Sequence, residues 1–376
     1  QLGPQWAPSW FQARSFSAPG ASFYVHIDDI LSKCKNATEL LWKIKELHRC
    51  CAKSGCALPL KKTHLGTEEV ECLGHEITTA GRKAAEKKID LVQNWPLPAS
   101  TASRLRSFFC ACVYLREYVF RFADKTYPLK KYLRGKGAAP IAGFADDKGA
   151  VRAFELLKRS LGNRALLSNI DYAGAQAYQE TGKGEQITID ASRFGYSFCI
   201  SPAQGFGAAP KICVYRGRSF SDRERGWSTL ERELYAFLYF IEEGARYIEG
   251  LPAVVLFDHK NLGRPELSRI WSSQIKRDKV SNWIERIQAR MDALLLWRAY
   301  LPGALNVLAD AGSRLGMGEA GGSENMQHLV PESIETFICE LFKEKPDQSG
   351  GNIAGLAPQD DDGSTPVESA AKATWQ

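Results

Sequence analysis

Four acidic residues occupy positions where carboxylates could gather around metal ions. Asp190 ends the apolar segment 187–189, and Asp258 directly follows the apolar segment 253–257. Glu233 falls in the first turns of an amphipathic pattern, and Asp310 lies near the start of another. Ligand crevices in open α/β sheets form at strand ends. Carboxylates that converge there repel one another unless cations neutralise them, and two Mg²⁺ ions held in this way support phosphodiester hydrolysis.

Each of these residues also has a simpler explanation. An Asp after a strand is often a turn former or a cap, and Glu233 has a rival in Glu231 on the same predicted helix. His259 could contact phosphate or transfer a proton near neutral pH, or it could be a structural hydrogen-bonding residue. The combined order and surroundings of the four carboxylates favour the metal site.

The elements that would position these carboxylates form an α/β pattern. Strands are predicted at 187–189, 194–200, 211–216, 253–257 and 295–300, and helices at 228–243, 280–294 and 307–314. Ser228 or Thr229 can cap the first of these helices. Upstream, strands are predicted at 23–31 and 69–77, and helices at 37–51, 87–95, 103–122 and 150–161. The segment 163–184 has no strong element, and Gly74 marks a bend or a close approach in its strand.

The charge distribution favours a polyanionic partner. The 376 residues include 49 Lys and Arg against 43 Asp and Glu, a net charge of +6. From residue 316 onward there are 3 basic and 11 acidic residues, so residues 1–315 carry 46 basic and 32 acidic ones, a balance of +14. Phosphate neutralisation by such a surface is the usual source of sequence-independent nucleic-acid affinity. A solubilising surface would have the same composition.

Hydropathy and cysteine usage narrow the setting. No run of 18 apolar residues and no signal-peptide pattern occurs, which argues against a membrane role. The ten cysteines are scattered without a CxxC, which favours an intracellular, reducing compartment. The densest group of candidate zinc ligands has the spacing of no standard zinc finger; it comprises His48, Cys50, Cys51, Cys56 and His64.

The residues around the four carboxylates resemble the ribonuclease H segment of gypsy-type LTR retrotransposon Pol polyproteins. In that family the segment reads DAS, then an E-K-E-L-L-A helix, then TDHK, then P-G-K-x-N-x-x-A-D-A-L-S-R. The corresponding segments here are 190–192 (DAS), 231–236 (ERELYA), 258–260 (DHK) and 302–314 (PGALNVLADAGSR). Gly312 replaces the family's Leu and Phe257 its usual Thr, and neither change removes a carboxylate.

This resemblance implies a set of site residues. Asp190, Glu233, Asp258 and Asp310 would bind two Mg²⁺ or Mn²⁺ ions, with His259 beside them. Glu233 is preferred to Glu231 because it directly precedes the Leu of the motif.

The resemblance extends upstream into a reverse transcriptase. Segment 24–31 (YVHIDDIL) is similar to the family's F-V-Y-x-D-D-I-L hairpin, so Asp28 and Asp29 would be palm aspartates, and His26 replaces the usual Tyr. Segment 70–75 (VECLGH) is similar to the strand that grips the primer. Segments 95–98 (WPLP) and 105–108 (LRSF) resemble parts of the thumb, and residues 118–121 fall where the family has Y-Y-R-R-F. The resemblance implies nucleic-acid contacts by four residues: Gly74, His75, Arg106 and Arg121.

Together these features predict four parts: a truncated α+β palm (1–78), a helical thumb and connection (79–180), a three-layer ribonuclease H-like α/β domain with a mixed sheet (181–315), and an acidic, largely disordered tail (316–376). The 27 residues before Asp28 contain no Asp, so the third palm aspartate is missing and DNA polymerisation is expected only in a longer parent chain.

The expected function is hydrolysis of the RNA strand of RNA–DNA hybrids. The expected partners are such hybrids and primer-template nucleic acid, with no membrane, in the cytoplasm, the nucleus or a virus-like particle. The family is also consistent with an oligomer or an association with other Pol products. The alternative function, from a different class, is a nucleic-acid-binding remnant without catalysis.

Overall fold

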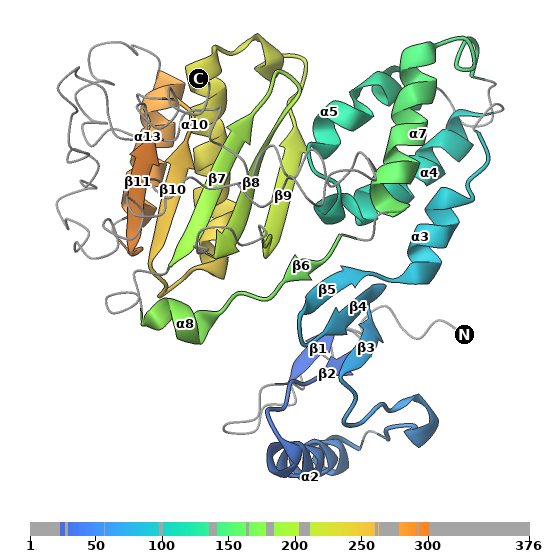
Figure 1. Ribbon diagram of the computed structural model, residues 1–376, viewed down its shortest axis with the longest axis vertical. Helices are drawn as coiled ribbons and strands as arrows, with labels where there is room; N and C mark the ends of the chain where they lie inside the picture. The colour runs from blue at the N-terminus through green and yellow to red at the C-terminus, as the bar shows by residue number, and fades with distance from the viewer. Residues whose placement is uncertain are drawn as a thin grey trace, which may run out of the picture. The chain divides into compact units, whose positions relative to one another are not determined.

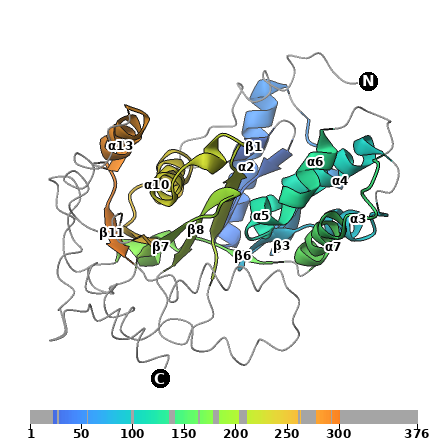
Figure 2. The ribbon, with the colours of Figure 1, turned by 90° about the horizontal axis from the view of Figure 1, so that it is seen from above.

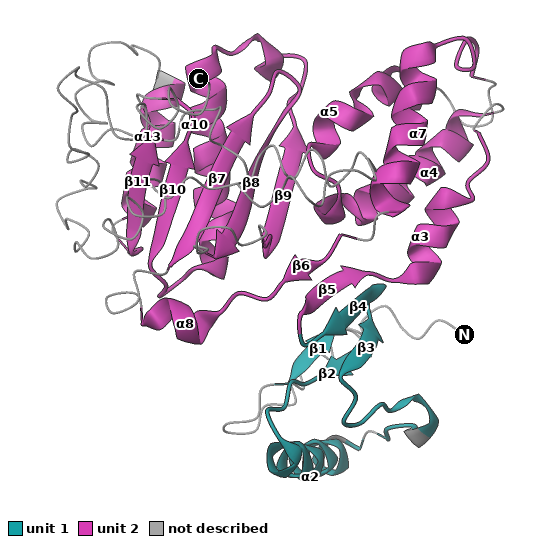
Figure 3. Cartoon of the chain, in the orientation of Figure 1, with its two compact units in different colours: residues 1–79 teal, residues 80–376 magenta. Residues whose placement is uncertain are grey.

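The computed structural model describes residues 23–26, 29–55, 57–97, 101–134, 141–162, 165–177, 184–202, 211–259, 262, 278–291 and 293–300. The chain divides into two compact units, residues 1–79 and 80–376 (Figure 3). The predicted helix at 307–314 and the predicted tail lie outside the described residues, as do Asp28 and Asp310. No helix in the described part is long and apolar enough to span a membrane.

The first unit combines two β-hairpins with one long helix (Figure 1). Its elements are β1 (Tyr24–His26), β2 (Asp29–Leu31), α2 (Ala37–Ser54), η1 (Leu60–Lys62), β3 (Glu69–Cys72) and β4 (His75–Thr78). The Asn36 side chain caps α2, accepting a hydrogen bond from the Glu39 amide. The single strand predicted at 69–77 was wrong, because Leu73 and Gly74 both have positive φ and turn the chain back into a hairpin. Gly74 does mark a bend, as predicted.

A helical segment opens the second unit. It contains β5 (Gly81–Ala84), α3 (Glu86–Gln93), α4 (Ala102–Tyr114), η2 (Arg116–Tyr118), α5 (Phe122–Thr126), η3 (Tyr127–Leu129), α6 (Lys130–Leu133) and α7 (Lys148–Gly162). The continuous helix predicted at 103–122 was wrong, because α4 ends at Tyr114 and Arg121 adopts a left-handed backbone with φ of 49°. Phe108 and Phe154 stack in its core with ring centroids 4.1 Å apart. β6 (Leu167–Ser168) and α8 (Tyr172–Gln176) follow.

A five-stranded mixed sheet completes this unit. Its strands are β7 (Glu185–Ala191), β8 (Gly195–Pro202), β9 (Val214–Ser219), β10 (Ala253–Phe257) and β11 (Leu296–Tyr300), in the order β11-β10-β7-β8-β9. β10 is parallel to β7 and to β11, whereas β8 is antiparallel to β7 and β9. The helical elements of this part are η4 (Glu224–Gly226), α10 (Thr229–Tyr239), η5 (Phe240–Gly244), η6 (Ala245–Tyr247) and α13 (Asp278–Met291). The predicted α/β class with a mixed sheet is confirmed.

Alternating side chains place this sheet between two hydrophobic cores. In β8, Phe198 and Ile200 face the core shared with α10 and α13, which lie on the same side of the sheet (Figure 2). Cys199 between them, and Tyr215 on β9, belong to the core of the helical segment. The helical segment therefore packs against the sheet directly, and its position depends on the ends of β8 and β9.

Gly195, at the start of β8, allows the closest approach between the sheet and α5. A Cβ atom at this position would lie 2.3 Å from the Ala123 Cβ and 2.6 Å from the carbonyl oxygen of Arg218. We predict that Gly195→Ala lowers the free energy of unfolding by about 2 kcal/mol, the usual scale of overpacking. Denaturant unfolding should show this loss. Gly226→Ala is the control, because its added methyl group would meet nothing within 4 Å; equal losses in both variants would contradict the prediction.

Glu185, at the start of β7, makes stability depend on pH. Its side chain is buried, and its Oε2 has no hydrogen-bond partner among the described residues. Burial first, and then the charge of Asp171, raise the pKa of Glu185 to about 7. Because the folded-state pKa is raised, ionisation of this group disfavours the fold, and its contribution to stability is lost as pH rises from the unfolded value through 7.

The corresponding prediction concerns Glu185→Gln. The variant cannot ionise, so its gain in unfolding free energy over wild type should grow by about 2 to 3 kcal/mol between pH 5 and pH 9. Denaturant unfolding at a series of pH values measures this difference. Parallel stability curves for the two proteins would contradict the assignment.

Candidate active site

Two of the predicted carboxylates lie at equivalent positions on neighbouring parallel strands. Thr188 of β7 pairs with Leu256 of β10. Asp190 lies two residues after Thr188 within β7, and Asp258 lies two residues after Leu256, directly after the end of β10. Because the strands are parallel, their carboxyl ends meet at one edge of the sheet. The structure therefore brings Asp190 and Asp258 to the same edge, where the apolar runs before them predicted strand ends.

Glu233 reaches this edge from α10, which packs on β7 and β8. Its side chain is buried, with 3% of the residue exposed, and its carboxylate accepts a hydrogen bond from the backbone N–H of Ala191. Its Oε2 has no hydrogen-bond partner among the described residues. Its rival Glu231 instead completes a capping box with Ser228 and pairs with Lys279 at 3.0 Å. Sequence reasoning therefore selected the glutamate that faces the sheet.

The three carboxylates affect one another electrostatically. Loss of solvent raises the pKa of Glu233 well above its ordinary value, and the charges of Asp258 and Asp190 raise it further. The pKa of Asp190 is raised by burial and then by the charges of Asp124 and Asp258, against the opposing effect of Arg121. The pKa of Asp258 is also raised, by desolvation, and His259 opposes this shift. The site thus holds more negative charge than its described surroundings neutralise.

The donor set fits a hard divalent cation. Carboxylate oxygens are the ligands that Mg²⁺ and Mn²⁺ prefer, and a buried, unsatisfied Glu233 oxygen is a position that a cation would satisfy. Within the described ranges no group of three or more His, Cys, Asp or Glu side chains has metal-binding geometry. Asp310, the fourth predicted ligand, lies outside these ranges, so the complete set stays a prediction.

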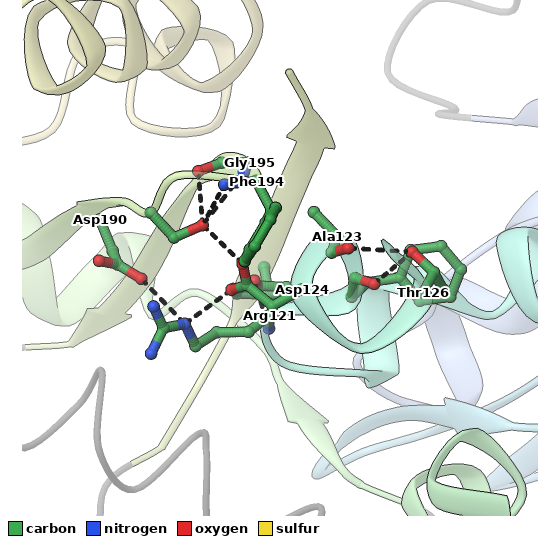
Figure 4. Close-up of polar contacts among 10 residues, drawn as sticks. Arg121, Ala123, Asp124, Thr126, Asp190, Phe194 and Gly195 are labelled. Carbon is green, nitrogen blue, oxygen red and sulfur yellow. Dashed lines mark hydrogen bonds and ion pairs between the residues drawn. The ribbon is translucent and has the colours of Figure 1, made fainter. Parts of the chain in front are cut away.

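An arginine from the helical segment stands beside this site (Figure 4). The Nε of Arg121 lies 2.9 Å from Oδ2 of Asp124 and 3.6 Å from Oδ2 of Asp190. Ser192 ties the same corner together: its hydroxyl donates to Oδ1 of Asp124 at 2.6 Å and accepts from the amides of Phe194 and Gly195. Asp124 was missed by sequence reasoning, because no motif or periodicity distinguishes it from a surface residue.

The remaining predicted residues lie as follows. His259 is half-buried directly after Asp258. Asp29 begins β2 and pairs with His26 across the first hairpin, whereas its neighbour Asp28 is outside the described residues. Gly74 lies in the turn before β4, which begins at His75. Arg106 is half-buried on α4. Their roles in catalysis and nucleic-acid binding stay predictions.

Comparison with known proteins shows what the second unit is similar to. Residues 181–289 match the family model described as an RNase H-like domain found in reverse transcriptase. The chain is 27% identical over 304 residues to the retrovirus-related Pol polyprotein from transposon opus of Drosophila melanogaster, covering 79% of this chain and 28% of that protein. It is 28% identical over 319 residues to the Pol polyprotein from transposon 412 of the same species, covering 84% and 24%. The predicted similarity to gypsy-type Pol polyproteins is confirmed.

Solved structures support the same fold. A foamy viral protease-reverse transcriptase in complex with RNA/DNA hybrid matches with a TM-score of 0.62 at 20% identity, over 79% of this chain and 38% of that one. The same viral protein in complex with dsDNA matches with a TM-score of 0.62, also at 20% identity, over 81% and 60%. The chain spans about a quarter of the length of the curated relatives it matches.

The two glutamates of α10 should respond oppositely to neutralisation. Glu233→Gln removes a buried charge whose pKa is raised, so it should raise the free energy of unfolding, most strongly at high pH. Glu231→Gln should lower it by about 1 to 2 kcal/mol through the weakened cap and ion pair. In the wild-type protein the pKa of Glu231 is lowered to about 2. The loss of stability in Glu231→Gln should therefore be complete above the ordinary pKa of a glutamate and become smaller as the pH falls below it. Denaturant unfolding at pH 4 and pH 8 measures both effects, and shifts of the same sign would contradict the assignment.

Proposed function

We propose that this chain is a divalent-metal ribonuclease H that cleaves the RNA strand of RNA–DNA hybrids. The observation that supports it most is the gathering of three carboxylates, Asp190, Glu233 and Asp258, at one edge of the sheet in an RNase H-like domain. Asp190 and Asp258 both raise the pKa of Glu233, and Asp258 raises that of Asp190, which is an unfavourable arrangement without a cation. A merely structural sheet edge would gain nothing from this repulsion.

The roles follow from the positions of the residues. Asp190, Glu233, Asp258 and Asp310 would hold two Mg²⁺ or Mn²⁺ ions. When bound, such ions activate water and stabilise the leaving oxygen of a phosphodiester. The Ala191 amide fixes one Glu233 oxygen and leaves the other available, while burial of this side chain keeps its orientation constant. His259, adjacent to Asp258, is placed to contact phosphate or to accept a proton at a nearby oxygen.

The hybrid would be held mainly through its phosphates and its shape. The +14 balance of residues 1–315 would supply the attraction, and the foamy viral protein of similar fold was solved in complex with RNA/DNA hybrid. Gly74, His75, Arg106 and Arg121 are the proposed contacts. RNA-directed DNA polymerisation, using Asp28 and Asp29, is proposed only for a longer parent chain. An intracellular location and association with other Pol products complete this proposal.

The test is cleavage of a labelled RNA–DNA hybrid in Mg²⁺ or Mn²⁺ by the full chain. Asp258→Asn should reduce the cleavage rate at least about 100-fold, the scale of losing a group that stabilises transition-state charge, while hybrid binding persists. Asp146→Asn, on an exposed turn of the helical segment, is the matched control and should cleave like wild type.

Two results would contradict the proposal. A folded wild-type chain that binds hybrid without cutting it would favour the alternative function, a catalytically inactive nucleic-acid-binding remnant. Cleavage that survives Asp258→Asn would show that the activity arises elsewhere.

A further inference from the structure

Arg121 combines an unfavourable backbone with a side chain directed at the site. Its φ of 49° and ψ of 42° lie in the left-handed region, which Gly or Asn adopts at lower cost than a long side chain. Its amide donates to the Tyr215 hydroxyl at 2.8 Å, which fixes this backbone against β9. A strained residue that persists because its surroundings hold it is a reason to look for function.

The guanidinium is shared between two carboxylates from different parts of the fold. It bonds Asp124, three residues along the same segment, at 2.9 Å, and it lies 3.6 Å from the strand-end Asp190. The longer distance describes an ion pair without a hydrogen bond. Asp124 is itself fixed by Ser192 at 2.6 Å. The firm bond therefore anchors the arginine, whereas the contact with Asp190 can be given up without freeing the side chain.

The charge at this corner is the reason for assigning Arg121 a role. Arg121 is the cation that opposes the raised pKa of Asp190, so it supplies part of the positive charge that a metal ion would supply. The Arg121 side chain is 43% exposed, whereas that of Asp190 is 25% exposed. The guanidinium is thus accessible to a ligand that approaches the sheet edge, and guanidinium groups bind phosphate in a bidentate fashion.

We propose that Arg121 is the counter-ion of Asp190 in the metal-free protein, and that it passes to a backbone phosphate of the hybrid when a divalent cation takes its place. This inference rests on the proposed nuclease function and adds a residue from outside the RNase H-like domain to its site. The exchange involves no covalent step. The exchange couples cation binding to hybrid binding. The cation ends the pairing of the guanidinium with Asp190, and the guanidinium, still bonded to Asp124, can then bind the phosphate.

The first measurement is Mn²⁺ affinity without nucleic acid, by calorimetry on the full chain. Arg121→Gln removes the charge and keeps a polar side chain, so the variant should bind Mn²⁺ at least about five-fold more tightly, the lower range of coupling between linked ligands. Arg121→Lys keeps the charge and should stay near wild type. Arg134→Gln breaks an exposed pair with Asp222 and should also leave the affinity unchanged.

The second measurement is hybrid affinity in Mg²⁺, by fluorescence anisotropy with a hybrid whose RNA strand carries 2′-O-methyl groups so that it is not cut and every proposed cation ligand is kept. Arg121→Gln should weaken hybrid binding and reduce the slope of log affinity against log salt by about one, the loss of one phosphate contact. If Arg121 had only a structural role, its substitution would not strengthen Mn²⁺ binding while weakening hybrid binding.

The outcomes separate this inference from the proposed function. No gain in Mn²⁺ affinity for Arg121→Gln, or an equal gain for Arg121→Lys or Arg134→Gln, would overturn the counter-ion role even if wild type cleaves hybrid. An unchanged salt slope would overturn the transfer to phosphate. A wild-type chain that cuts no hybrid would remove the proposed function, while the Mn²⁺ comparison would still decide the role of Arg121.

Discussion

Repulsion between carboxylates at one edge of the sheet is the interaction that the arrangement of the surrounding strands and helix must accommodate. The parallel pairing of β7 with β10 places Asp190 and Asp258 at matching positions. Glu233 comes from α10, which packs on β7 and β8. Desolvation raises the pKa values of all three groups, and neighbouring carboxylates raise those of Glu233 and Asp190 further. This arrangement would be unfavourable in a domain selected for stability alone. The proposed cation site would provide the physical reason to keep the three carboxylates, since natural proteins accept local instability where function requires it.

The second constraint is the direct packing of the helical segment on the sheet. Cys199 and Tyr215 face the core of that segment, while Phe198 and Ile200 on the same sheet face α10 and α13. The sheet is therefore covered by different elements on its two faces, and the close approach at Gly195 and Ala123 brings α5 to the carboxylate edge. As a result, residues 121–124 can reach Asp190 although the RNase H-like match begins at residue 181. The proposed site therefore includes residues outside the matched segment.

The sequence predicted the positions of three carboxylates better than it predicted the segment that approaches them. Asp190, Asp258 and Glu233 could be found because apolar runs, a helical repeat and family motifs all place them at element ends. The helix predicted at 103–122 failed because apolar residues continue past its true end. Tyr118, Val119 and Phe120 are buried, but they pack in the core from a 3-10 turn and the extended chain after it. The pairing of Arg121 with Asp190 joins residues 69 positions apart, and no local pattern encodes such a contact.

Glu231 has a structural role in α10, and its contacts help to set the direction of the neighbouring Glu233. Glu231 accepts from the Ser228 amide at 2.8 Å and pairs with Lys279 of α13. The Lys279 ammonium also lies 4.5 Å from the ring centroid of Trp227, just before the helix. These contacts fix both the first turn of α10 and its rotation about its own axis. Residues two apart on a helix point in directions about 200° apart, so fixing Glu231 toward α13 directs Glu233 toward the sheet. Glu231, whose pKa is lowered, thus helps to orient Glu233, whose pKa is raised.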